Sequence, residues 1–318
     1  MAIPPPPDRH APGAANDLLL DERDTAAKSK PESKDEQKKE EEEKQKAEKS
    51  GRAGGLAADP ETGTLLSPHE IHDNVEESAR EELDRPAMAL VWSALASGLA
   101  IGFGFVIGAF LTTLVPEKYH TAVVALAYPI GFVLVVMARQ QLFTENTLEP
   151  IIPLLEDFCR RTLAKVGRLW GVVLAANMVG ALIFALLLAR TQMLDEQMRS
   201  ALDSVAEHAV NGGALIVFYK AIFAGWLVAL MAWLLSSTRY TGAQIVLIWL
   251  TTGPIAALGF KHSIAGSVEA FYLAARGIYG WGMMAGSFIV PAILGNIVGG
   301  VVFVALLNHG QVAHGASE

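Results

Sequence analysis

The sequence predicts an all-α membrane protein with six transmembrane helices, of which the second and the fifth are broken. Three observations lead to this fold class. Most charged residues precede residue 86, although 52% of the whole chain is hydrophobic. Six apolar segments follow, and segments of roughly 18 or more apolar residues match a hydrocarbon core about 30 Å thick. Two polar interruptions then fall at corresponding places in the two halves of the apolar region.

Residues 1–65 are expected to form a disordered, charged cytoplasmic tail. Residues 28–50 are almost entirely Lys, Glu, Gln and Ser. Such a segment buries too little apolar surface to offset the entropy cost of ordering its backbone. Its many glutamates argue against a nucleic-acid-binding arm, and the beginning of the chain lacks the basic-then-apolar pattern of a cleaved signal peptide. With Cys159 as its one cysteine, the chain can form no internal disulfide.

A short cytoplasmic amphipathic helix is expected over residues 66–86. Ser67 can cap it, Pro68 suits the first helical position, and Glu70 stands where the reciprocal residue of a capping box belongs. The segment is highly charged, so we expect it to lie before the membrane and not within it.

The six predicted spans form a pore domain over residues 87–308, and residues 309–318 are expected to be a cytoplasmic C-terminal tail. The spans cover residues 88–114, 121–137, 169–188, 214–235, 243–260 and 283–307. Basic residues gather near one set of span ends: Arg80, Arg85, Arg160, Arg161, Lys165, Arg168 and Arg239. Because positive charge is enriched in cytoplasmic loops, we expect both termini to be cytoplasmic. The expected location is the bacterial inner membrane.

The first polar break follows the second span, at residues 138–150. A helix that begins at residue 121 reaches only about 25 Å by residue 137, at 1.5 Å per residue. The break therefore falls at or inside the far membrane interface. Pro150 and Pro153 argue against one continuous helix through it.

The second break, at residues 259–267, follows the fifth span, which Pro254 also weakens. Irregular backbone at membrane depth is tolerated only where protein or a watery cavity satisfies its polar groups. Each break lies in the middle segment of a three-span half. This pattern predicts an inverted repeat whose half-helices converge on a transported ion.

The breaks contain the candidate functional residues. His262 is the one histidine embedded among the apolar spans, and an intramembrane ionisable residue is a functional-site hypothesis by default. The Thr144 hydroxyl can donate to an anion or to His262, or can cap the following turn. Arg139 and Lys261, one at each break, either snorkel to an interface or make the pore entrance electropositive.

Four stretches in these regions resemble signature segments of the formate/nitrite transporter family, in order, within residues 85–308: residues 142–144, 223–233, 259–265 and 295–300. The resemblance implies a homopentamer of six-span protomers, each with its own pore and an aquaporin-like inverted repeat. It also implies passage of small monovalent anions such as formate or nitrite, often with a proton. By position, Thr144 and His262 match the family's threonine and central histidine. The remaining matches are Phe132 and Ile255 at the apolar constriction, Leu142 and Phe143 at the first break, and Asn296 in the sixth span.

Several positions depart from the family pattern. Lys261 stands where the family usually has glutamate, and Gly225 and Gly266 stand where asparagine is usual. At the start of the fourth span, His208 or Ala209 replaces the expected lysine. Arg139 is also unusual where small residues are expected. These differences mark a divergent branch and concern the substrate and the direction of transport more than the fold.

The sequence therefore predicts a channel or transporter for small monovalent anions: formate, nitrite or related weak-acid anions, with proton coupling through His262. The expected partners are such an anion, the lipid bilayer and further copies of the chain, with no cofactor, metal or nucleic acid. A neutral small-solute pore, which needs no titratable centre, is one alternative. A membrane anchor or assembly protein with a vestigial pore is another. Enzyme activity is not expected, because the spans contain no metal-binding histidine pair and no Gly-x-Ser-x-Gly motif.

Overall fold

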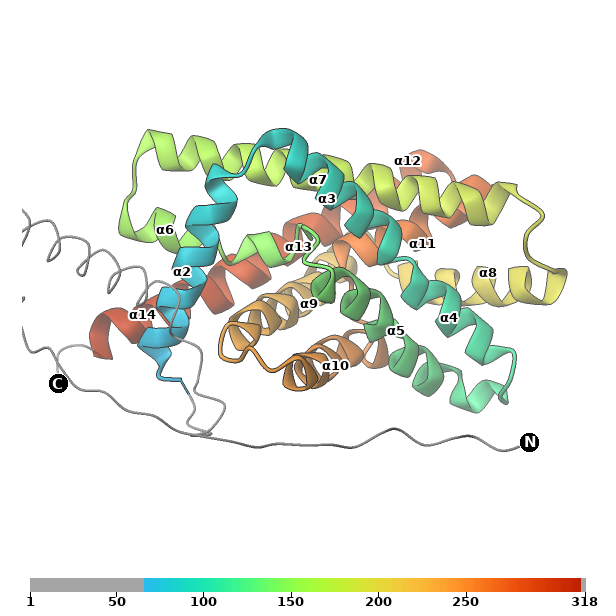
Figure 1. Ribbon diagram of the computed structural model, residues 1–318. Coiled ribbons are helices and arrows are strands. Elements are labelled where there is room, and N and C mark those ends of the chain that lie inside the picture. Colours follow the sequence, from blue (N-terminus) through green and yellow to red (C-terminus); the bar gives the residue numbers. More distant parts are fainter. Residues whose placement is uncertain (1–65, 316–318) are drawn as a thin grey trace, which may run out of the picture. The chain divides into compact units, whose positions relative to one another are not determined.

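The computed structural model describes residues 66–315, and every regular element in this range is a helix (Figure 1). The predicted charged tail, residues 1–65, lies outside the described residues, as do residues 316–318.

The first described helix, α2 (Pro68–Asp84), begins with the capping box that the sequence predicts. The Ser67 hydroxyl accepts the Glu70 N–H at 3.3 Å, and the Glu70 carboxylate accepts the Ser67 N–H at 2.7 Å. One face of the helix is buried through Val75, Ala79 and Leu83, which recur at the spacing of an amphipathic helix.

Five stretches of helix in the described residues are long and apolar enough to cross a membrane. They are Ala87–Thr112, Glu117–Met137, Arg160–Arg190, Ala214–Leu235 and Trp281–Val312. The first contains α3 (Ala87–Ala100) and α4 (Phe103–Thr112), and the second contains η1 (Glu117–Tyr119) and α5 (His120–Met137). The third and fourth are α7 (Arg160–Arg190) and α9 (Ala214–Leu235). The last contains α12 (Trp281–Met284), η3 (Ala285–Ile289), α13 (Val290–Gly300), η4 (Val301–Leu306) and most of α14 (Leu307–Gly315). The remaining predicted span is the apolar helix α10 (Thr241–Ala257), which has 17 residues.

The second and fifth helices are broken, as predicted. After α5 the chain leaves the helix, forms the short turn η2 (Glu145–Thr147) and continues in α6 (Ile151–Glu156). After α10 it leaves the helix again and continues in α11 (Ser263–Arg276). In each half the first and third spans pack together, α3 against α7 and α9 against α13, while α5 packs against α10 between the halves. Three crossings per half place the second half upside down relative to the first, so the predicted 3+3 inverted repeat is confirmed.

Two groups of short elements lie at opposite ends of this domain. We call them the α2 end, where α2, α6 and α14 gather, and the α8 end, where α8 (Glu196–Val210) and α12 lie (Figure 1). Helix α8 was not predicted from the sequence, although Asp195 caps it by accepting the Met198 N–H at 2.8 Å. The last helix, α14, continues to Gly315, within the residues 309–318 predicted as the C-terminal tail, and it packs against α2.

Candidate functional site

Both broken helices end in the same type of turn. Arg139 and Gly259, at equivalent positions after α5 and α10, have left-handed backbones with φ of 51° and 64°. The Phe260 N–H then donates to the Ile255 carbonyl at 2.8 Å, and the equivalent bond in the first break is 3.0 Å long. This is the pattern of a helix C-terminus closed by a left-handed residue. The Arg139 side chain is exposed and does not line the cavity described below.

Asn296, in the sixth span, holds the second break in place. Its Oδ1 accepts the Ser263 N–H at 2.8 Å, and its Nδ2 donates to the carbonyls of Lys261 at 3.0 Å and Ala221 at 2.7 Å. The side chain is fully buried, and buried backbone groups need such partners. The Asn296 side chain therefore positions the second break by binding the backbone groups of that break.

Asn177, in the third span, does the same in the first break. Its Oδ1 accepts the Phe143 N–H at 2.9 Å, and its Nδ2 donates to the carbonyls of Gln141 at 2.9 Å and Ala94 at 2.7 Å. We call these two sets of bonds the asparagine locks. Asn177 was not predicted from the sequence, yet it is the one amide side chain in the apolar part of α7.

The locks depend on close contact between the paired helices. A Cβ at Gly98 would lie 2.2 Å from the backbone oxygen of Asn177, and one at Gly225 would lie 2.3 Å from that of Asn296. Gly225 was noted above as a departure from the family pattern. The close contact explains why glycine stands at this position, because no side chain fits there. Gly266 is similar, since a Cβ would lie 2.4 Å from the Phe288 ring.

One buried hydrogen bond connects the two breaks. Thr144 Oγ1 lies 2.7 Å from His262 Nε2, and both side chains are buried. His262 Nδ1 accepts the Ala265 N–H at 3.1 Å and so caps α11. A neutral imidazole carries one proton, so these partners assign it to Nε2, which donates to Thr144. The hydroxyl hydrogen of Thr144 is then available to another acceptor.

Apolar side chains surround this pair. The Phe132 ring meets the His262 ring edge-on, with centroids 5.0 Å apart. Leu142, Phe143 and Ile255 are also fully buried. The structure therefore brings Thr144, His262 and Phe132 together, while Leu142, Phe143 and Ile255 lie in the helix ends and the break beside them.

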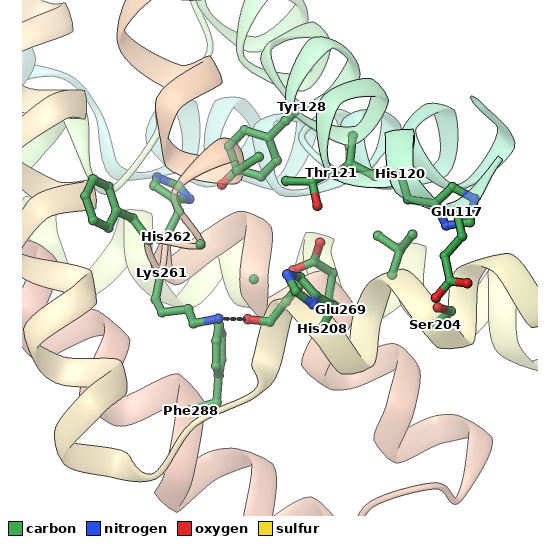
Figure 2. A pocket seen from close by; sticks show the side chains of 17 residues that line it. Glu117, His120, Thr121, Tyr128, Ser204, His208, Lys261, His262, Glu269 and Phe288 are labelled. Atoms are coloured by element: carbon green, nitrogen blue, oxygen red, sulfur yellow. Dashed lines mark hydrogen bonds between the residues drawn. The ribbon is translucent and has the colours of Figure 1, made fainter. Parts of the chain in front are cut away.

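A cavity of about 310 Å³ reaches from the α8 end of the domain to His262 (Figure 2). Residues of α5, α8, α11 and the second break line it, including Tyr128, His208, Lys261 and Glu269. The Lys261 ammonium donates to the Ala209 carbonyl, and the side chain is only 3% exposed. Lys261 thus faces the cavity and ties the second break to the end of α8, and it does not snorkel to a surface.

Three polar groups near the cavity were not predicted from the sequence. The Glu269 carboxyl group is buried and lines the cavity together with Lys261. Tyr128 lines the cavity from α5. The Ser263 hydroxyl, beside His262, has no hydrogen-bond partner among the described residues. An acidic residue within an otherwise apolar stretch of α11 was the available signal for Glu269.

Comparison with known proteins gives consistent matches. The sequence profile described as formate/nitrite transporter matches residues 69–310. The inner membrane protein YfdC of Escherichia coli (strain K12) is 36% identical over 252 residues, which cover 78% of this chain and 80% of that protein. The formate channel BtFdhC of Bacillus thuringiensis is 28% identical, over 74% of this chain and 92% of that one. A solved pentameric formate channel with formate bound superimposes with a TM-score of 0.59 at 24% identity, over 72% of this chain and 97% of that chain.

Proposed function

The chain belongs to the formate/nitrite transporter family, and from this premise we propose that it forms a transmembrane pore for small monovalent anions. The observation that carries the proposal is the buried 2.7 Å hydrogen bond between Thr144 and His262, at the inner limit of the cavity. Among the described residues, it is the only side-chain hydrogen bond between the two breaks.

The hydrogen bonds of this pair suit an anion. An anion that enters an apolar constriction loses hydration, and the loss of an unreplaced hydrogen bond is costly. The free hydroxyl hydrogen of Thr144 can donate to the anion, while the His262 Nε2–H donates to Thr144 and strengthens that bond. The Lys261 ammonium, facing the cavity, raises the local concentration of anions.

The apolar residues set the selectivity in this proposal. Phe132 and Ile255 offer no hydrogen bonds in exchange for water, and the desolvation cost of an ion rises steeply with its charge. Small monovalent anions such as formate and nitrite are therefore favoured over bulky or multivalent ions.

The proposal also includes the assembly and the location of the protein. The assembly is a homopentamer with one pore per protomer, supported by the pentameric channel of the same fold. The location is a bacterial inner membrane, with the α2 end in the cytoplasm.

Anion flux into proteoliposomes tests the role of the pair. Thr144→Val keeps the shape of the side chain but removes the donor. Losing one buried hydrogen bond costs about 1–3 kcal/mol, which corresponds to roughly 5- to 150-fold slower flux. Thr112→Val is the matched control, because the buried Thr112 hydroxyl donates to Ala109 in its own helix at 2.7 Å. Wild-type flux through both Thr144→Val and His262→Asn, at every pH from about 5 to 8, would refute the proposed centre.

The substrate and the coupling are measured in the same vesicles. Formate, nitrite, acetate, lactate and hydrosulfide are each supplied with and without a pH gradient. Proton coupling predicts that the gradient changes the flux and that His262→Asn abolishes the change. Swelling of the vesicles in glycerol with no anion flux would identify a neutral-solute pore instead.

A further inference from the structure

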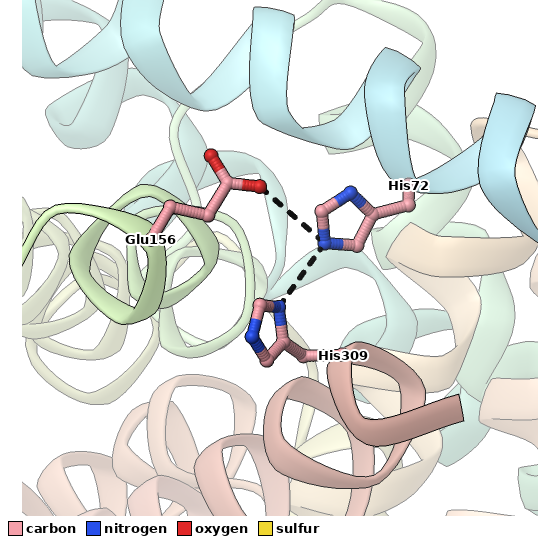
Figure 3. Close-up of side chains that lie close together, drawn as sticks. All are labelled: His72, Glu156 and His309. Atoms are coloured by element: carbon pink, nitrogen blue, oxygen red, sulfur yellow. Dashed lines mark hydrogen bonds and ion pairs between the residues drawn. The ribbon is translucent and has the colours of Figure 1, made fainter. Parts of the chain in front are cut away.

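Three potential metal ligands from distant parts of the sequence converge at the α2 end (Figure 3). His72 lies on α2, Glu156 is the last residue of α6, and His309 lies on α14. His72 Nε2 is 3.4 Å from His309 Nδ1 and 3.8 Å from Glu156 Oε1. The three ligand atoms lie within 4.8 Å of one another.

We propose that His72, Glu156 and His309 bind a divalent transition-metal ion of the zinc type, with water as a fourth ligand. Zinc lies about 2.0–2.1 Å from a histidine nitrogen and about 2.0–2.2 Å from a carboxylate oxygen, so neighbouring ligands in a tetrahedral site are roughly 3.3–3.6 Å apart. The two measured separations, 3.4 and 3.8 Å, are within a few tenths of an ångström of this range. Two imidazoles and one carboxylate are a donor set for zinc, cobalt or nickel and not for calcium or magnesium, which prefer oxygen ligands.

The surroundings orient the ligands. Arg80 donates to Oε2 of Glu156 at 3.3 Å, which leaves Oε1 directed at His72. The residue His72 is only 4% exposed, and its Nδ1 lies 3.9 Å from a carboxylate oxygen of Asp73. This separation is too long for a hydrogen bond, so Asp73 acts on the imidazole only through its charge.

The local charge also matches a divalent cation. Asp73, Glu76 and Glu156 contribute three carboxylates around His72, and Arg80 contributes one guanidinium. The cluster is thus left with two net negative charges when its carboxylates are ionised. An ion bound here would connect α2, α6 and the end of the last helix.

The purified full-length protein, stripped of metal with EDTA, tests the site by titration with zinc and with cobalt. We expect one zinc ion per chain by calorimetry and a tetrahedral absorption spectrum with cobalt. His72→Ala, His309→Ala and Glu156→Gln should each weaken zinc binding by at least about 100-fold, because each removes one of three ligands. His69→Ala, which removes an exposed histidine from the same helix, should bind as the wild type does.

Glu156→Gln keeps the size of the side chain and is therefore the decisive variant if a histidine variant misfolds. Zinc should raise the unfolding temperature of the wild type and of His69→Ala but not that of Glu156→Gln, since a ligand that binds only the folded state stabilises it. Wild-type zinc affinity in Glu156→Gln and His309→Ala would overturn the proposal. A cobalt spectrum without tetrahedral character, or no binding at all, would overturn it too.

Discussion

Replacing Asn296 with leucine should destabilise the protein by about 2–6 kcal/mol. The variant leaves the Ser263 N–H and the Lys261 carbonyl without partners, because the described residues offer these two groups no other hydrogen bond. Each orphaned buried group costs about 1–3 kcal/mol. The Ala221 carbonyl, which lies inside α9, retains its helical partner.

Thermal unfolding in detergent measures the effect. For a chain of this size a change of 1 kcal/mol shifts the midpoint by roughly 2–4 °C, so Asn296→Leu should lower it by roughly 4–24 °C. Asn177→Leu should lower it by a similar amount, because the Phe143 N–H and the Gln141 carbonyl lose their partners in the same way. Asn74→Leu is the control, since its half-buried amide makes one bond, to Ser236.

The outcome can contradict this reasoning in two ways. If both lock variants unfold at the temperature of Asn74→Leu, the hydrogen bonds of the locks do not hold the breaks in place. If one lock variant is strongly destabilised and the other is not, the two locks are not energetically equivalent.

Three further predictions use the same assays. Arg139→Gly should raise stability by about 1 kcal/mol without slowing anion flux, because glycine adopts a left-handed backbone without the steric cost that Arg139 bears at φ 51°. Gly259→Ala should lower stability by a similar amount. Equal unfolding midpoints for the two variants would contradict this reasoning. Gly225→Ala should lower the free energy of unfolding by about 1–3 kcal/mol, because the new Cβ would lie 2.3 Å from the backbone oxygen of Asn296. An unchanged unfolding midpoint would show that α9 and α13 separate easily. In metal-free protein, burial and then a neighbouring carboxylate raise the pKa of Glu156 from 4.5 to about 7, so the folded state binds more protons than the unfolded state between these values. Stability should therefore fall as pH rises through this window, and Glu156→Gln should make stability less dependent on pH. An equal slope of stability against pH in both proteins would assign the effect to another group.

The sequence was sufficient for the spans and the breaks, because both depend on local properties. An apolar run of membrane length must form a helix to pair its backbone groups, and a polar segment with proline beside it ends that helix. The same locality explains why the capping box at Ser67 and Glu70 could be predicted. Thr144 and His262 were singled out because they are polar residues within these breaks, and the structure connects them by a hydrogen bond.

The remaining features depend on which helices become neighbours. Asn177 is a single amide in an apolar helix, and its role appears only when α3 and α7 pack together. The left-handed turn at Arg139 was hidden, because arginine gives no signal for a positive φ. His72 and His309 were assigned to separate segments, and no motif relates residues so far apart in the chain.

The asparagine locks also bear on the order in which the protein is made. Each lock closes within its own half: Ala94 with Asn177, and Ala221 with Asn296. The first half can therefore complete its lock in the membrane while the ribosome is still producing the second. The bond between Thr144 and His262 joins the halves, so it forms only after both exist. A chain interrupted after the first half thus contains every partner of the first lock but lacks the bond that connects the two breaks.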